Sequence, residues 1–500
     1  MKVWAINPPF LPKYSRPQRS PAVTKSGTLY YPIWLAYTVG VLEEAGFEVT
    51  FTDAPAAGLT TEHVLARARS LQPSFIVMDT STPSIENDLQ VADALKVVLP
   101  RSVLLLVGTH VSALPEETLA KAGSVDALAR REYEYTVREL AALVAECNGA
   151  RPDDERLRRV AGLSFRSAGG IVHNPDRPFI ESLDELPWVS RVYKKHLNIR
   201  DYFNQNALYP MVTLVTSRGC PFRCSFCLYP QTFTGRRYRF RRIEDVVNEM
   251  EYVAREFPDA KSIFFEDDTL TANRKRCLEF AEAVIRRGIR IPWEANSRID
   301  LDLETMRQMR AAGCRELCVG FESGDQEILD GMRKGIRTER MFEFMKNARA
   351  AGLLVHGCFM FGFPGETRER IQKTIDLAVQ LNPDTAQFYP VMVYPGTEAY
   401  EEYRAKGWLA ASSFSDWLTP EGLHNCVVRN EHLSAAELVQ LCDTARRRFY
   451  LRPRYFAYKL GQIMRHPDEF RRTARAASVF FKYLIRGSRV RRGAGAAVGG

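Results

Sequence analysis

Runs of apolar residues alternate with amphipathic stretches along most of the chain, and this alternation predicts an α/β fold. In the first third, each apolar run is followed by helical periodicity. Strands are expected at 2–7, 47–53, 74–79 and 102–107, and helices at 31–46, 62–71, 84–99 and 116–122. Strands and helices in this order predict a doubly wound, Rossmann-like parallel sheet over residues 1–145.

The alternation returns after residue 200 and produces six strand–helix units. Apolar runs that predict strands lie at 209–216, 261–268, 291–296, 316–322, 354–361 and 385–390. Six strands that are each followed by a helix or a loop predict an open (β/α)6 barrel, a partial TIM barrel, over residues 201–410. Functional residues of such barrels lie at the carboxyl ends of the strands.

Two further regions complete the predicted organisation. Residues 146–200 are rich in turn-forming residues and contain one hairpin-like stretch at 163–173, so we expect a linker with a small β element. Residues 411–500 form a predicted helical, basic C-terminal region, with a helix at 433–450 and a Gly/Ala-rich end after residue 493.

Composition indicates a globular protein of several domains, because 45% of its 500 residues are hydrophobic and 26% are charged. No apolar run reaches the roughly 18 residues that a membrane span requires. The net charge of +9 comes from the C-terminal region, where residues 446–492 hold 15 Lys and Arg against two acidic residues. This basic, aromatic-rich stretch is compatible with a helical cap over the barrel, an anionic membrane surface, a phosphorylated substrate or nucleic acid.

The most informative motif is Ser217-Arg-Gly-Cys220-Pro-Phe-Arg-Cys224-Ser-Phe-Cys227, which follows the first barrel strand. Three thiolates within eight residues can hold one inorganic centre. Iron–sulfur cubanes normally have four cysteine ligands, so a site with three leaves one iron open to a substrate. The motif therefore predicts a [4Fe-4S] cluster bound by Cys220, Cys224 and Cys227.

Zinc and disulfides are the alternatives to a cluster. A structural zinc site needs a fourth Cys or His nearby, but only Cys277 lies between Cys227 and Cys314, and no histidine lies between His196 and His356. The chain begins without a signal-peptide pattern, so we expect a reducing, cytoplasmic location in which thiols stay free. Cys314 and Cys318 are expected to be small buried residues rather than ligands.

The cysteine spacing, with the aromatic Phe226 before the last cysteine, resembles the radical S-adenosylmethionine (SAM) superfamily. The resemblance implies that the amine and carboxylate of SAM chelate the open iron, and that one electron from the cluster cleaves SAM to a 5′-deoxyadenosyl radical. It also implies a flavodoxin- or ferredoxin-type electron donor.

Further residues carry the resemblance in the expected order. The strand at 261–268 ends in three carboxylates, which are costly to bury unless they meet cations or hydroxyls. The resemblance implies that Asp267 and Asp268 contact the SAM amine and ribose, although one of the three could instead cap the next helix. It implies that Arg298 and Glu322 hold the SAM carboxylate and ribose. Phe359 and Gly362 fall where the adenine-contacting strand of the family lies, so the resemblance implies adenine contacts for them, with a turn as the alternative role for Gly362.

The N-terminal region lacks GxGxxG after its first strand, which argues against a dinucleotide. It resembles the cobalamin-binding domain of cobalamin-dependent radical SAM enzymes in three segments: Thr80-Ser81-Thr-Pro-Ser84, Gly108-Thr-His110 and Arg131-Glu-Tyr-Glu134. Residues 8–32 contain no histidine, so the cobalt is not expected to have a histidine ligand from that loop. His110 is expected to pack against the corrin or its tail, with ligation as the less favoured alternative.

The resemblance covers residues 1–410 and is closest to the hopanoid-biosynthesis-associated radical SAM protein and its relatives, through Tyr31-Pro-Ile-Trp34 and Cys227-Leu-Tyr-Pro-Gln231. It implies a cobalamin-dependent enzyme that methylates an unactivated carbon of a lipid or natural-product intermediate. The alternative is ring contraction or cyclisation of a lipid or sugar headgroup without methyl transfer.

Two rival functions are less favoured. Enzymes of tRNA methylthiolation need a second cysteine triad in the N-terminal domain, where this chain has only Cys147. A non-enzymatic iron–sulfur protein would not require Asp267, Arg298 and Glu322. The expected partners are a small-molecule or lipid-like substrate and the inner membrane surface, contacted peripherally through the basic C-terminal region, and nucleic acid is not expected.

Overall fold

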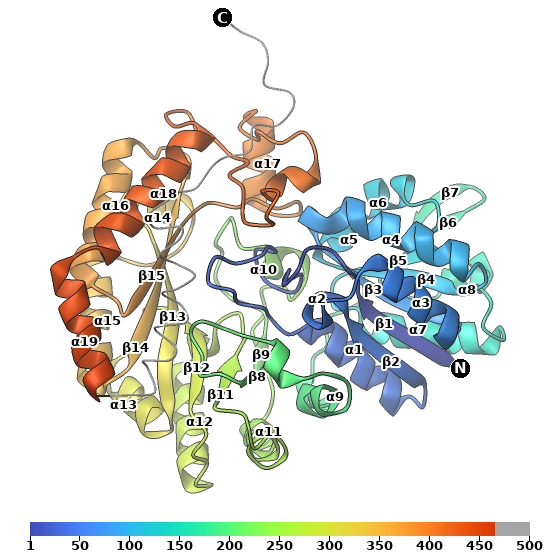
Figure 1. Cartoon of the computed structure of the whole chain (residues 1–500), viewed down its shortest axis with the longest axis horizontal. Coiled ribbons are helices and arrows are strands. Elements are labelled where there is room, and N and C mark those ends of the chain that lie inside the picture. Colours follow the sequence, from blue (N-terminus) through green and yellow to red (C-terminus); the bar gives the residue numbers. More distant parts are fainter. Residues whose placement is uncertain (466–500) are drawn as a thin grey trace, which may run out of the picture.

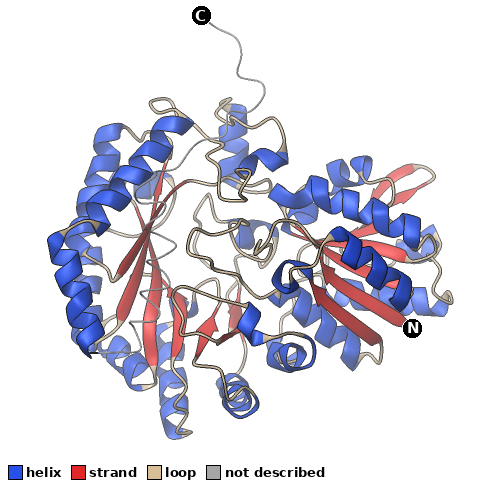
Figure 2. Cartoon of the chain, viewed as in Figure 1, coloured by secondary structure: helices blue, strands red, loops and turns tan. Residues whose placement is uncertain are grey.

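The computed structural model describes residues 1–465, which fold around two parallel sheets (Figure 1). The sheets lie in separate lobes, and helices cover both of them (Figure 2). The fold class predicted from the sequence is confirmed, because a Rossmann-like unit is followed by an open barrel and by C-terminal helices.

The first sheet has seven strands in the order β2-β1-β3-β4-β5-β6-β7. Its first five strands are parallel, and the β6–β7 hairpin adds antiparallel to β5. The strands are β1 (Lys2–Asn7), β2 (Glu48–Asp53), β3 (Phe75–Thr80), β4 (Val103–Gly108), β5 (Ala127–Ala129), β6 (Leu163–Ser167) and β7 (Gly170–His173). The predicted domain boundary at residue 145 stays a prediction, but the sheet itself continues to His173 within the predicted linker.

Apolar side chains on alternate positions of these strands form a core on each face of the sheet. One face packs against α1 (Ile33–Glu44) and α7 (Glu134–Glu146), and the other against α3 (Thr61–Leu71), α4 (Ile85–Val98) and α6 (Pro115–Lys121). The short helices of this lobe are α2 (Ala54–Ala57), α5 (Thr109–Ala113) and α8 (Asp154–Leu157). The sequence pattern did not predict β5 or α7.

The second sheet has six parallel strands in the order β15-β14-β13-β12-β11-β8, as expected of an open barrel. The strands are β8 (Met211–Leu214), β11 (Ser262–Phe265), β12 (Trp293–Ser297), β13 (Cys314–Glu322), β14 (Leu354–Phe361) and β15 (Thr385–Pro390). The helices between them are α11 (Ile243–Glu256), α12 (Arg274–Arg286), α13 (Leu303–Ala311), α14 (Gln326–Gly331), α15 (Thr338–Ala351) and α16 (Arg368–Leu381).

Additional segments flank the barrel. Before it lies α9 (Val189–His196), and a small ribbon of β9 (Ser217–Arg218) and β10 (Arg239–Phe240) encloses α10 (Leu228–Thr232). After it come α17 (Glu398–Ala405), α18 (Ala435–Tyr450) and α19 (Pro453–Arg465). Among residues 1–465, every helix is too short or too polar to cross a lipid bilayer.

A long segment between β1 and α1, residues 8–32, leaves the first lobe and reaches the barrel (Figure 1). We call it the bridging loop. At one end, the Tyr14 hydroxyl bonds the Ser81 hydroxyl at the carboxyl end of β3, at 2.8 Å. At the other, Arg19 donates to the Asp267 carbonyl just past β11, at 2.9 Å. The loop therefore joins the carboxyl ends of the two sheets.

Candidate functional site

The three motif cysteines lie on one loop between β9 and α10. Cys224 is buried, whereas Cys220 and Cys227 are half-buried, and all three are free thiols. The loop begins at Gly219, whose φ is +84° and where a Cβ atom would lie 2.1 Å from the Arg237 carbonyl oxygen. Only glycine fits there without displacing the backbone. The sequence therefore fixes where the loop leaves the ribbon.

The surroundings of the thiols suit an anionic cluster. Burial raises the pKa of Cys220 to about 11, with the Asp268 carboxylate adding to the effect and Arg298 opposing it. Burial also raises the pKa of Cys227, again opposed by a cation, Arg19. Thiolates must form when metal binds, so the metal and these cations have to supply the stabilisation that solvent does not.

Among residues 1–465, no three Cys, His, Asp or Glu side chains converge on a single metal ion. A cubane does not need that convergence, because each of its thiolate ligands binds a different iron. The free thiols, the mutual electrostatic effects among the three cysteines and the adjacent cations fit a [4Fe-4S] cluster.

The three carboxylates after β11 have different tasks. Asp267 is buried and accepts hydrogen bonds from the Thr216 amide (2.7 Å) and hydroxyl (2.6 Å) and from the Ser217 hydroxyl (2.5 Å). Asp268 accepts from the Gly219 amide at 3.1 Å and the Thr234 hydroxyl at 2.7 Å. Both aspartates therefore hold the cluster loop in place.

Glu266 faces elsewhere. It forms an ion pair with Arg19 of the bridging loop, and its second carboxylate oxygen is buried without a hydrogen-bond partner. Leaving such an acceptor unpaired costs free energy, so an unpaired oxygen at a strand end indicates a place for a ligand donor.

Arg298 and Glu322 meet at the same edge, around Lys334. The Glu322 carboxylate pairs with the Lys334 ammonium at 2.8 Å, and its other oxygen is buried without a partner. Arg298 donates to the Lys334 carbonyl oxygen at 2.8 Å and lies 3.5 Å from the ring centroid of Phe222 in the cluster loop. Glu322 has a φ of +65°, a costly conformation for a side chain of this type.

The remaining predicted SAM contacts lie in the packed core beside this edge. Phe359 is fully buried between the rings of Phe321 and Phe388, at centroid distances of 5.6 and 5.2 Å. Gly362 has a φ of +111° and donates its amide to Glu366 at 2.5 Å. Phe226 packs edge-to-face on Phe363 at 5.6 Å. Their adenine contacts stay a prediction, and packing and turn formation explain the observed positions of Phe359 and Gly362.

The residues predicted to bind cobalamin converge at the carboxyl edge of the first sheet. Ser81 and Ser84 hydroxyls are 2.8 Å apart, and Ser84 donates to Asp88 at 2.6 Å. Thr80 donates to the Val107 carbonyl oxygen at 2.7 Å. Gly108 has a φ of +116°, and a Cβ there would lie 2.3 Å from the Thr80 carbonyl oxygen. Close backbone approach therefore requires glycine at this position.

His110 is buried at this edge, beneath the segment that precedes the C-terminal helices. Its ring lies 4.9 Å from that of Phe414, and its Nδ1 is 3.2 Å from the Thr82 hydroxyl. Burial lowers the pKa of His110 to about 3, so its imidazole is neutral at physiological pH.

Buried ion pairs join the first lobe to the cluster loop. Arg218, two residues before Cys220, pairs with Glu134 at 2.7 Å, and both side chains are at most 1% exposed. Arg239 of β10 pairs with Glu132 at 2.8 Å. The Arg218 guanidinium also lies over the Trp34 and Tyr37 rings of α1.

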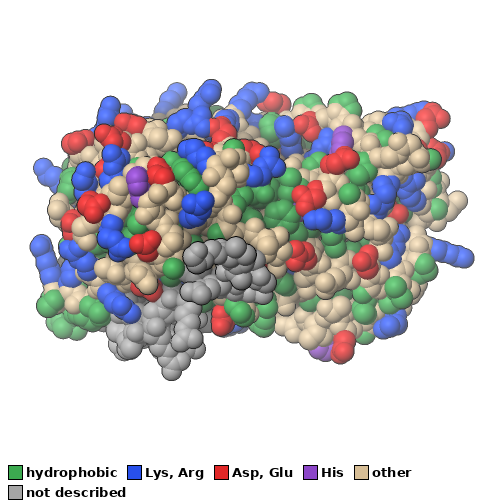
Figure 3. Space-filling view, turned by 90° about the horizontal axis from the view of Figure 1, so that it is seen from above, with side chains coloured by type: hydrophobic (Ala, Val, Ile, Leu, Met, Phe, Trp, Pro, Cys, Tyr) green, Lys and Arg blue, Asp and Glu red, His purple; other side chains and the backbone are tan. Residues whose placement is uncertain are grey.

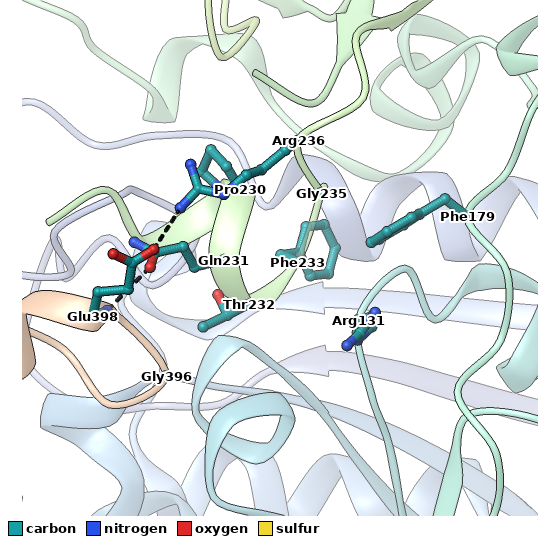
Figure 4. A pocket seen from close by; sticks show the side chains of 10 residues that line it. All are labelled: Arg131, Phe179, Pro230, Gln231, Thr232, Phe233, Gly235, Arg236, Gly396 and Glu398. Atoms are coloured by element: carbon teal, nitrogen blue, oxygen red, sulfur yellow. Dashed lines mark hydrogen bonds and ion pairs between the residues drawn. The ribbon is translucent and has the colours of Figure 1, made fainter. Parts of the chain in front are cut away.

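A cleft of about 340 Å³ opens between the lobes beside α10 (Figure 4). Arg131 lines it from the first lobe and Phe233 from the end of α10, and Glu398 lines it from α17. Glu398 pairs with Arg236 at 3.3 Å, and its amide is bonded to the side chain of Gln231 at 3.0 Å. The cleft thus adjoins both the cluster loop and Arg131 of the Arg131–Glu134 motif.

Several residues at the site were missed from the sequence. Arg19 and Lys334 lie outside the predicted motifs, although Lys334 lies in a basic Arg333-Lys-Gly335 turn that could have drawn attention. Arg218 lies within the cysteine motif, but no role was predicted for it. Glu266 belongs to the acidic triplet, but the prediction favoured its two neighbours.

Known proteins resemble the chain in both halves. Residues 214–378 match the family model of the radical SAM superfamily, and residues 19–141 match that of the B12 binding domain. An uncharacterized methyltransferase of Pyrococcus horikoshii is 30% identical over 86% of this chain and 89% of its own length. The anaerobic magnesium-protoporphyrin IX monomethyl ester cyclase of Cereibacter sphaeroides is 29% identical over 85% of this chain and 68% of its own.

Among solved structures, the cobalamin-dependent SAM radical enzyme OxsB, with aqua-cobalamin and SAM bound, has a TM-score of 0.69 at 14% identity. The alignment covers 98% of this chain and 73% of OxsB, so the two proteins share a fold. The family matches confirm the predicted cofactors, which are a [4Fe-4S] cluster and SAM for the barrel and cobalamin for the first lobe. The chain therefore belongs to the cobalamin-dependent radical SAM enzymes, in which a B12-binding domain precedes the radical SAM domain.

Proposed function

We propose that this enzyme transfers a methyl group to an unactivated carbon of a lipid or natural-product intermediate. When bound, the cluster, SAM and cobalamin supply hydrogen-atom abstraction and the methyl group, chemistry that protein side chains do not provide. The observation that carries the proposal is the apposition of the two strand edges. The bridging loop bonds Ser81 at one edge and the Asp267 carbonyl at the other.

The polar groups at the barrel edge support specific roles in SAM binding. Glu322 and Glu266 each offer a buried oxygen without a partner, which suits the amine and ribose hydroxyls of SAM. Arg298 suits the carboxylate, as a guanidinium held against Phe222. Asp267 and Asp268 would act by holding the cluster loop, with Phe226, Phe359 and Gly362 shaping the neighbouring wall.

Cobalamin would bind at the carboxyl edge of the first sheet, through Thr80, Ser81, Ser84, Gly108 and His110. This edge is lined by small side chains and by close backbone contacts, as ligand sites on doubly wound sheets are. The cleft lined by Arg131 and by residues of α10 offers space beside this edge. The neutral His110 would pack against the cofactor rather than carry charge.

Mass spectrometry of the product formed with deuterated-methyl SAM tests the proposal. Methyl transfer predicts labelled product together with deoxyadenosine, and a Cys224→Ala variant should form neither. Deoxyadenosine with an altered but unlabelled product would contradict methyl transfer and support the second candidate below. Reductive SAM cleavage by Cys224→Ala would contradict the cluster assignment as well.

The second candidate is ring contraction or cyclisation of a lipid or sugar headgroup without methyl transfer. It is favoured by the similarity to the protoporphyrin monomethyl ester cyclase, which extends over most of the chain. That relative is named for ring closure and not for methylation.

We also propose a flavodoxin- or ferredoxin-type electron donor. Arg223 within the cluster loop is exposed and places a positive charge on the outer side of the loop. An acidic donor protein would be attracted to this side, and its electron transfer should slow as salt rises. Stopped-flow reduction of the cluster at increasing ionic strength measures this.

A further inference from the structure

Exposed apolar side chains are concentrated at the C-terminal end of the described chain. Within residues 1–465, ten large hydrophobic side chains are exposed, and five of them lie in the 14 residues from Leu451 to Met464. The most exposed in this stretch are Met464 at 76%, Leu460 at 62% and Phe456 at 50%. Clustered exposed apolar residues indicate an interaction surface, whereas single ones do not.

Helix α19 buries two polar side chains against the barrel and exposes three large apolar ones. Lys459 and Gln462 are buried and bond each other at 2.8 Å, and Gln462 also donates to Asp384 beneath the helix at 3.3 Å. Tyr455 donates to the Asp384 carbonyl oxygen at 2.9 Å. A helix on a water-exposed surface normally does the reverse, with its apolar face on the core. The outward face, made of Phe456, Leu460 and Met464, therefore suits an apolar environment.

The sequence around this face is strongly basic. Residues 446–465 contain seven Lys and Arg and no acidic residue. Arg447 and Arg454 are exposed, whereas Arg448 pairs with Asp376 of α16 at 2.9 Å. Figure 3 shows one side of the molecule, on which acidic and basic side chains are interspersed. The chain continues beyond the described residues with eight more Lys and Arg against two acidic residues.

We propose that α19 binds the surface of an anionic lipid bilayer, with Phe456, Leu460 and Met464 inserted among the lipids and the neighbouring arginines on the headgroups. Amphipathic helices that lie in the membrane interface combine these two features. A second protein copy would account for the exposed apolar side chains but not for the excess of Lys and Arg in residues 446–465. Binding of nucleic acid would account for the positive charge but not for the exposed apolar side chains of Leu460 and Met464. The inference does not depend on the reaction that the enzyme performs.

Sedimentation of the full-length protein with lipid vesicles tests the inference. Binding is expected to vesicles of phosphatidylcholine with phosphatidylglycerol, to be much weaker with phosphatidylcholine alone, and to fall as salt is raised. The double variant Leu460→Glu/Met464→Glu should bind at least about tenfold more weakly, because two apolar anchors and part of the charge attraction are lost. Both side chains are exposed, so the thermal midpoint should stay that of the unmodified protein.

Matched controls come from exposed apolar residues elsewhere. Ile285→Glu and Phe342→Glu alter side chains that are 45% and 43% exposed on α12 and α15, and they should leave vesicle binding unchanged. The proposal is overturned if the α19 variant binds as the unmodified protein does, or if both controls weaken binding equally. It is also overturned if the α19 substitutions abolish a dimer seen in analytical ultracentrifugation, or binding to RNA, while vesicle binding is absent.

Discussion

The carboxyl edges of the two sheets follow the same topological rule but differ in how their polar groups are satisfied. At the first sheet, Ser81, Ser84 and Asp88 form hydrogen bonds with one another and with the bridging loop. At the barrel, Glu266 and Glu322 each keep one buried oxygen without a partner. The serines of the first edge are thus satisfied within the protein, whereas two carboxylates of the barrel edge keep an oxygen that a ligand could satisfy.

This difference indicates which cofactor relies on preformed polar contacts. An unpaired buried carboxylate oxygen raises the free energy of the empty site, and a ligand that donates a hydrogen bond recovers it. At the barrel, SAM would donate such a hydrogen bond, and this would strengthen its binding. At the first sheet, binding has to rest on shape and backbone approach, for which Gly108 is suited.

The largest expected effect concerns the ion pairs that hold the two edges opposite each other. Arg218→Ala would leave Glu134 buried without its cation, so the free energy of unfolding should fall by about 3–5 kcal/mol. Urea unfolding measures the change. The control Arg237→Ala removes a pair whose side chains are 72% and 60% exposed, and it should cost at most about 1 kcal/mol. Equal losses in both variants would show that the buried pair adds nothing to lobe attachment.

A smaller effect is expected on SAM affinity, which should depend on the barrel edge and not on the edge of the first sheet. Glu322→Gln should weaken SAM binding by about ten- to a hundredfold, since a hydrogen bond to a charged acceptor contributes about 1.5–3 kcal/mol. Ser84→Ala at the first sheet should leave SAM affinity unchanged and cost about 1 kcal/mol of stability. Equilibrium dialysis with labelled SAM on reconstituted protein compares the two. A Ser84 variant that loses as much SAM affinity as the Glu322 variant would erase the distinction between the edges.

The third effect depends on pH and is confined to the first edge. Burial raises the pKa of Asp79 from 3.8 to about 7. The unfolded chain then releases this proton at lower pH than the folded one, so the contribution of Asp79 to stability is full below about pH 3.8 and is lost as pH rises through about 7. Asp79→Asn should therefore be more stable than the unmodified protein at pH 8, by up to about 4 kcal/mol, and nearly unchanged at pH 4. Thermal unfolding at the two pH values checks this, and a stability difference that is the same at both would be inconsistent with a neutral Asp79.

The strands of both sheets could be predicted because each is an apolar run that ends in polar or turn-forming residues. Strand β5 was not predicted, because Ala127–Ala129 is too short to show an alternating hydrophobic pattern. The cluster cysteines were found because three ligands lie within eight residues. Arg19 was not, because its partner Glu266 lies 247 positions away in the sequence.

The choice among the acidic residues after β11 shows a second limit. Adjacent side chains of a strand point to opposite sides, so the sequence tells that Glu266 and Asp267 differ, but not which one faces the cluster loop. Only tertiary contacts decide it: Asp267 is occupied by Thr216 and Ser217, and Glu266 retains an unpaired oxygen.

The bridging loop has a consequence for synthesis. The ribosome makes residues 8–32 long before the barrel strand whose end they contact, since Arg19 precedes Glu266 by 247 residues. Until β11 has emerged and paired, Arg19 has no carboxylate to bind. The bridging loop can therefore complete its contacts only after the barrel has begun to fold.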